Sequence, residues 1–222
     1  MGSLAAAAGK FAEKLADVLD VFDLSFFVAG AASLGALLVW LQQQNVGIPQ
    51  DLSTDRALVG VIAAYVLGLA TYSLGRAMRR MVLERVLAGH NTDKRMHELF
   101  EQHRLDRFAD FALYADRPAA LYSRFWVLVR SEDALRETYA LVRRYWVLGA
   151  TYDGLGLAAL LWVLPISGLE VEALTQGLLS AGVFAAAAFS WRQASRYHGY
   201  QVDELAATAA HWHQSQPANE PQ

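Results

Sequence analysis

The chain has 222 residues, a formal net charge of -3 and no cysteine. The acidic balance argues against a nucleic-acid-binding protein, and the lack of cysteine excludes disulfides, thiolate metal sites and cysteine nucleophiles. Hydrophobic residues make up 55% of the chain and charged residues only 18%. This composition lies between that of a soluble domain and that of a membrane bundle, so it predicts a protein with both parts.

The N-terminal segment, residues 1–23, is expected to form an amphipathic helix. Phe11, Leu15 and Phe22 lie at helical spacing on one face. Acidic residues interrupt the apolar run, so the segment is not read as a secretory signal peptide. The helix is expected either to lie along a membrane surface or to pack on the rest of the protein.

A first transmembrane hairpin is predicted over residues 24–75. The stretch 24–42 carries no charge, and a polar linker containing Gly47 and Pro49 separates it from a second apolar stretch at 57–75. Each stretch is about 20 residues long, which is the length needed to cross a bilayer as a helix.

A second transmembrane hairpin is predicted over residues 145–191. Its first span, 145–164, begins with an aromatic pair after two arginines, and its second span covers 174–191. The first span contains one acid, Asp153. An ionisable group inside a span is energetically costly, and it therefore marks a candidate site.

The distribution of basic residues predicts the orientation. Residues 76–144 hold fourteen of the nineteen Lys and Arg residues, and basic loops stay on the cytoplasmic side. We therefore expect a multi-pass protein of the cell inner (plasma) membrane, with both termini and residues 76–144 in the cytoplasm.

Residues 76–144 are predicted to form a cytoplasmic helical domain, because apolar residues recur there at three- and four-residue spacing. Residues 192–222 are expected to form a C-terminal helix and a frayed tail. No helix breaker separates Ser131 from Leu164, so a single continuous helix capped by Ser131 is predicted, on the order of 50 Å long.

The two apolar hairpins resemble each other in sequence. The first and third spans both begin with aromatic residues, contain an early glycine (Gly30 and Gly149) and end in leucines and a tryptophan. This pattern indicates either a duplication or chance similarity, because membrane spans share a small set of residue types.

Asp153 has two interpretations. It is either an ion or proton site that lines a pore, or a hydrogen-bonded acid that fixes helix packing. In the first interpretation, Tyr65 and Tyr72 on the second span are predicted to belong to the pore or ion site. In the second, these two tyrosines and Ser33 on the first span are the candidate hydrogen-bond partners of the carboxyl group.

Small residues recur at every fourth position of two spans, and such ridges let helix backbones approach closely in lipid. They are expected to pack either within one four-helix bundle or between subunits of a homo-oligomer. The predicted helix-packing residues are Ala150, Gly154, Ala158, Gly177, Ala181 and Ala185.

Arginines follow the predicted cytoplasmic ends of the spans. They are expected to reach anionic lipid headgroups and set topology, or to hold a phosphate-bearing ligand or set charge selectivity at a pore mouth. The residues are Arg76, Arg79, Arg80, Arg143, Arg144, Arg192 and Arg196.

No enzymatic site is visible in the sequence. The stretch HELFEQH, residues 97–103, lacks the second histidine of the zinc motif HExxH. We therefore predict no catalytic residues, no metal and no cofactor.

The sequence predicts an all-α polytopic membrane protein with four transmembrane helices that extend into an α-helical cytoplasmic domain. The preferred function is an oligomeric channel, pore-forming or membrane-effector protein, similar in layout to a bacterial toxin or defence effector. The alternative is a non-conducting scaffold or accessory subunit whose cytoplasmic helices dock a protein partner. In both cases the expected partners are the lipid bilayer and other copies of the chain.

Overall fold

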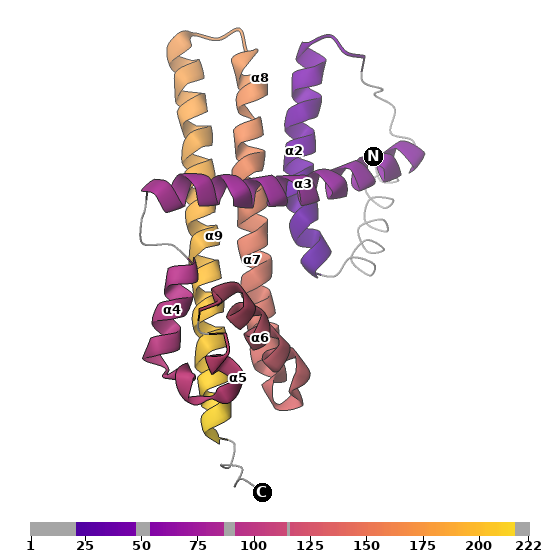
Figure 1. The fold of residues 1–222 in the computed structure, drawn as a ribbon. Coiled ribbons are helices and arrows are strands. Elements are labelled where there is room, and N and C mark those ends of the chain that lie inside the picture. The colour runs from indigo at the N-terminus through magenta and orange to yellow at the C-terminus, as the bar shows by residue number, and fades with distance from the viewer. Residues whose placement is uncertain (1–20, 48–53, 87–91, 115, 216–222) are drawn as a thin grey trace, which may run out of the picture. The chain divides into compact units, whose positions relative to one another are not determined.

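The computed structural model describes residues 21–47, 54–86, 92–114 and 116–215. These residues form helices and turns, with no β-strand among them (Figure 1). Four of the helices are long and apolar enough to cross a membrane, judged by length and composition. The prediction of an all-α chain with four long apolar helices is thus confirmed. The predicted amphipathic helix at the N-terminus falls almost wholly outside the described residues.

The helices follow one another along the chain as α2 (Val21–Gln43), α3 (Thr54–Val86), α4 (Thr92–Gln102), η1 (Leu105–Arg107), α5 (Ala109–Ala112), α6 (Pro118–Ser131), η2 (Asp133–Leu135), α7 (Arg136–Leu161), α8 (Val163–Ser167) and α9 (Ala173–Ser215).

The chain divides into two compact units, which are described separately below. Unit 1 comprises Met1–Met78 and Ala150–Arg192, and unit 2 comprises Arg79–Gly149 and Gln193–Gln222. The boundary falls inside α3, α7 and α9, so each of these helices contributes one segment to each unit.

In unit 1, the C-terminal ends of α2 and of the α7–α8 segment lie together. The side-chain amide of Gln43 donates a hydrogen bond to the carbonyl oxygen of Pro165 at 3.0 Å, and α2 packs against α8. After a turn, α9 returns beside α7 (Figure 1). The first and third apolar helices therefore run in the same direction.

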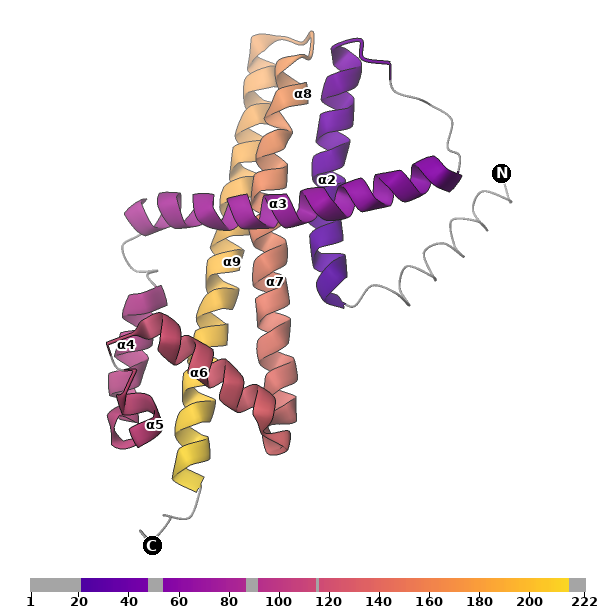
Figure 2. The same ribbon diagram turned by 45° about the vertical axis from the view of Figure 1, so that its right-hand side comes forward.

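The course of α3 differs from the predicted hairpin, because α3 crosses α2 and α7 instead of running antiparallel beside α2 (Figures 1 and 2). A Cβ atom at Gly30 would overlap the carbonyl oxygen of Ala64, and one at Gly68 would overlap that of Phe26. Glycine removes the side chain that would hold the two helices apart, so their backbones touch at the crossing point.

The predicted continuous helix from Ser131 to Leu164 is wrong at both ends. Ser131 is the last residue of α6, and Glu132 has an extended backbone (φ -98°, ψ 115°) before the short helix η2. At the other end, Pro165 cannot donate a backbone hydrogen bond and its ring clashes with the carbonyl four residues earlier, at Leu161. That residue is where α7 ends.

Unit 2 has a hydrophobic core built from α4, η1, α5, α6, α7 and α9. Rings of Phe111 and Phe125 meet edge to face, with centroids 5.1 Å apart, at its centre. The buried core residues are Met96, Leu99, Phe100, Leu105, Phe111, Leu121, Phe125, Val129, Val142, Val202, Leu205, Ala206, Ala209 and Ala210.

An ion pair on the surface of unit 2 joins α4 to α9. Nε of Arg95 donates to Oδ1 of Asp203 at 3.0 Å, and this hydrogen bond raises the pKa of Arg95 above its ordinary value. Both side chains are more than 40% exposed, so the pair orients α4 but stabilises the fold little.

The glycine contacts predict different effects for two substitutions on α3. Gly68→Ala places a methyl group against the backbone of α2, and overpacking of this kind costs about 1–3 kcal/mol. Gly60→Ala is the matched control, because a Cβ there meets nothing within 4 Å, and alanine favours helix by about 1 kcal/mol. We expect the thermal midpoint in detergent to fall for Gly68→Ala and to stay level or rise for Gly60→Ala. Equal thermal midpoints for the two variants would contradict the backbone contact between α2 and α3 at Gly68.

Candidate functional site

Asp153 lies where α2, α3 and α7 meet in unit 1. Its side chain is fully buried, with 0% of its surface exposed. A Cβ at Gly75 of α3 would overlap the backbone carbonyl oxygen of Asp153, and Gly154 faces Ala29 of α2. We call this arrangement of Ala29, Gly75, Asp153 and Gly154 the three-helix junction.

The junction is tightly closed by backbone. A Cβ atom at Gly154 would lie 2.8 Å from the Cβ of Ala29 and 3.6 Å from the backbone nitrogen of Tyr72. Carbon atoms normally pack at about 3.5–4.0 Å, so α7 leaves no room for a side chain there. Within this one chain, Asp153 is therefore enclosed by protein.

Polar side chains from α3 lie beside the junction. The ring of Tyr72 packs on Phe26 with centroids 5.3 Å apart, and its hydroxyl accepts a hydrogen bond from Nη1 of Arg76 at 2.8 Å. Nε of Arg76 is buried and has no hydrogen-bond partner among the described residues. Asp153 itself has an interaction partner in the structure.

The other predicted partners of Asp153 lie on the same helices. Tyr65 is half-buried on α3, two helical turns before Tyr72. The hydroxyl of Ser33 is fully buried and donates to the carbonyl oxygen of Ala29 at 2.8 Å. Thr71 similarly donates to the carbonyl oxygen of Gly68 at 3.1 Å. These two hydroxyls are satisfied within their own helices, which suits an apolar environment.

The two predicted small-residue ridges have different surroundings. In α7, Ala150, Gly154 and Ala158 are buried. In α9, Gly177, Ala181 and Ala185 are exposed, and a Cβ at Gly177 would meet nothing within 4 Å. The α7 ridge is therefore packed within the chain, whereas the α9 ridge is exposed on its surface.

The predicted arginines differ widely in exposure. Arg79 is buried, with 7% of its surface exposed, and its Nη1 donates to Ser195 at 3.2 Å. Nη2 of Arg196 donates to the hydroxyl of Tyr200 at 3.2 Å. Arg143 is half-buried. The remaining exposed arginines of the predicted set are Arg80, Arg144 and Arg192.

The chemistry of the junction is limited. Among the described residues that form it, Asp153 is the single carboxyl group, so no acid–base pair is present. No group of three or more His, Asp or Glu residues in the described ranges is placed to hold a metal ion. The junction can fix helix packing through hydrogen bonds or exchange a single proton.

The tight crossing at Gly68 and Gly75 was missed by the sequence reasoning, which concentrated on ridges in α7 and α9. The signal was present, because residues seven apart lie about two turns apart on one helix face. Which helix that face meets is decided by tertiary packing, and spacing alone does not reveal it.

In comparisons with known proteins, no protein-family model matches the chain, and no curated protein or solved structure is significantly similar to it.

Two substitutions of Asp153 follow from its enclosure. Asp153→Asn keeps the shape and the capacity for hydrogen bonds, so we expect the thermal midpoint in detergent to stay level or rise. Asp153→Leu removes the polar partner and adds volume between touching backbones, which costs about 1–3 kcal/mol. At about 2–4 °C per kcal/mol, the midpoint should fall by several degrees. A leucine variant as heat-stable as the parent would show that the site is not tightly packed.

Proposed function

We propose that the chain is an integral membrane protein whose apolar helices α2, α3, α7 and α9 lie in the bilayer. We further propose that it acts there as a non-enzymatic scaffold or accessory subunit. Insertion in the membrane is supported by the exposure of large apolar side chains. Large exposed apolar residues on α3 and α9 are Leu58, Val59, Ile62, Val66, Leu69, Leu74, Met81, Val82, Leu174, Leu178, Leu179, Phe184 and Phe189.

Exposure on this scale is unfavourable in water. Apolar surface costs about 25 cal/mol per Å² when it faces water, and soluble monomers rarely expose a contiguous apolar patch larger than a few hundred Å². Lipid removes this cost without any further protein partner. The same helices have their backbone groups paired internally, as a span requires.

The ends of the apolar helices support one membrane orientation. Because Gln43 contacts Pro165, the linker after α2 and the turn after α8 belong on the same side of the bilayer. The basic segment 76–144 then belongs on the opposite, cytoplasmic side. We place the protein in the cell inner membrane with both termini in the cytoplasm.

The helix α3 lies across α2 and α7 (Figures 1 and 2), and this course bears on whether α3 spans the membrane. The polar residues Gln44 and Asn45, which follow α2, cannot lie in hydrocarbon without losing the hydrogen bonds that water gives them. The helix α3 is long and apolar enough to span a bilayer. We therefore propose that α3 crosses the bilayer, tilted against α2 about the contact at Gly68.

The enclosure of Asp153 favours a scaffold over a pore made by one chain. A conduction path needs its polar residue to be wet, yet Asp153 has no exposed surface and is flanked by helix backbones. In this account, unit 2 supplies the surface that docks a cytoplasmic partner protein.

Conduction by a homo-oligomer is the second candidate, and one observation favours it. The outward-facing small residues Gly177, Ala181 and Ala185 of α9 form a surface on which a second copy can pack closely. A channel, toxin-like or defence effector would then form between copies of the chain.

Topology is testable with single cysteines, since the chain has none of its own. We introduce them at Gln44, Glu101 and Ser167, which are all exposed, and label intact cells with an impermeant reagent. Gln44 and Ser167 should be labelled, and Glu101 should react only after the cells are opened. Equal labelling of Gln44 and Glu101 in intact cells would show that α3 does not cross.

Ion flux separates the two functions. We expect liposomes that hold the purified chain to leak no faster than empty liposomes across a range of protein densities. Flux that rises with protein density and changes in Asp153→Asn would contradict the scaffold and support the conducting oligomer.

A further inference from the structure

The surface of unit 2 contains a basic pocket that the proposed function does not use. It has a volume of about 400 Å³ and is lined by Gln102, His103, Arg104, Arg107, Phe108 and Gln214. All six residues belong to unit 2. The volume lies in the range of small-molecule sites.

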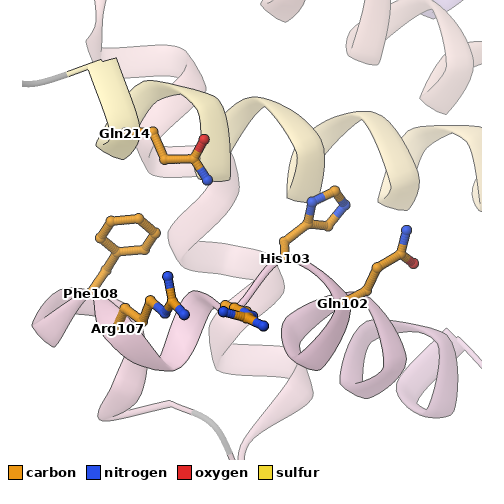
Figure 3. A pocket seen from close by; sticks show the side chains of 6 residues that line it. Gln102, His103, Arg107, Phe108 and Gln214 are labelled. Atoms are coloured by element: carbon orange, nitrogen blue, oxygen red, sulfur yellow. The ribbon is translucent and has the colours of Figure 1, made fainter.

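The pocket is built by the turn between α4 and α5, and by the last turn of α9. Figure 3 shows His103 and Arg107 pointing from this turn toward α9, which brings Gln214 to the opposite wall. Phe108 forms one end, and its ring stacks on that of His213 with centroids 4.9 Å apart. This ring contact between Phe108 and His213 therefore fixes one wall of the pocket.

The backbone of the turn places two arginines together. Arg104 has a left-handed conformation (φ 51°, ψ 46°) and immediately precedes the 3₁₀ helix η1, whose last residue is Arg107. The side chains of both arginines line the pocket. Leu105, which is fully buried, anchors the turn and leaves both guanidinium groups at the pocket.

The two guanidinium groups are not neutralised within the described part of the chain. Neither has an ion pair or side-chain hydrogen bond with a described residue, and both side chains are exposed. Asp106 lies between them in the sequence but does not line the pocket. Glu101, one turn earlier, pairs instead with His97 at 3.4 Å.

From this geometry we propose that the pocket binds a phosphate group, carried by a soluble phosphate ester or by a phospholipid headgroup. Guanidinium groups form paired hydrogen bonds with phosphate oxygens. The amides of Gln102 and Gln214 add neutral donors, and Phe108 offers an apolar edge to the rest of the ligand. The inference depends only on unit 2 and is independent of the proposed membrane topology.

The test uses the full chain in phosphatidylcholine nanodiscs and in a chloride buffer. Inorganic pyrophosphate is titrated calorimetrically as the soluble probe. In parallel, binding of the nanodisc-embedded chain to phosphatidylcholine vesicles with and without phosphatidylinositol 4-phosphate is measured by co-sedimentation. Pyrophosphate binding indicates a soluble ester, and a response only to the phosphoinositide vesicles indicates a lipid headgroup.

Three variants separate a built site from general charge attraction. The double variant Arg104→Gln/Arg107→Gln should weaken binding by about ten-fold or more. Arg107→Lys keeps the charge but removes the paired donors, so it should also bind clearly more weakly. Arg130→Gln is the control, since it removes an exposed charge of α6 in the same unit, outside the pocket.

Saturable binding that is lost in the double variant, reduced in Arg107→Lys and unchanged in Arg130→Gln supports the proposal. Thermal unfolding of each variant checks that unit 2 remains folded, and Arg107→Lys provides the decisive comparison if the double variant is unstable. The phosphate-site proposal is overturned if neither pyrophosphate nor the phosphoinositide vesicles bind. It is also overturned if Arg130→Gln weakens binding as much as Arg107→Lys does.

Discussion

Backbone contact between helices is the interaction on which unit 1 depends. At Gly68 and Gly75, α3 has no side chain to hold it away from α2 and α7, so the three helices meet at their carbonyl groups. This close approach gives dispersion contacts that do not rely on the exclusion of water. It also encloses Asp153, so a residue that looks like an ion site in the sequence has the surroundings of a packing residue.

The same arrangement explains the distribution of apolar surface. Small residues such as Ala29, Ala64 and Gly154 are buried in unit 1 beside a few large ones such as Phe26, whereas many large apolar side chains, such as Val59 and Leu178, face outward. A water-soluble helical protein places most of its large apolar residues inside. The outward-facing apolar residues are accounted for if lipid surrounds unit 1. Unit 2 shows the ordinary pattern, with Phe111 and Phe125 buried and most of its described arginines exposed, although Arg79 is buried.

Much of this fold could be predicted from the sequence, because runs of about twenty apolar residues between polar breaks leave few alternatives to helix. The end of α7 at Leu161 follows from Pro165, although the missing breaker near Ser131 misled the prediction at the other end. The crossing of α3 and the pocket at Arg104 were not predicted. Both depend on which distant segments of the chain meet. The pocket depends also on the left-handed backbone conformation of Arg104, which an arginine in the sequence does not indicate.

We propose that the outward faces of α3 and α9 contact lipid. Spin labels on single cysteines at Val59, Val66 and Leu178, which are 65%, 57% and 66% exposed, test it directly in proteoliposomes. We predict that dissolved oxygen relaxes all three labels efficiently while a water-soluble nickel complex does not, with a label at Glu101 showing the opposite preference. Nickel relaxation at Val59, Val66 and Leu178 as strong as that at Glu101 would place these faces in water and contradict the account.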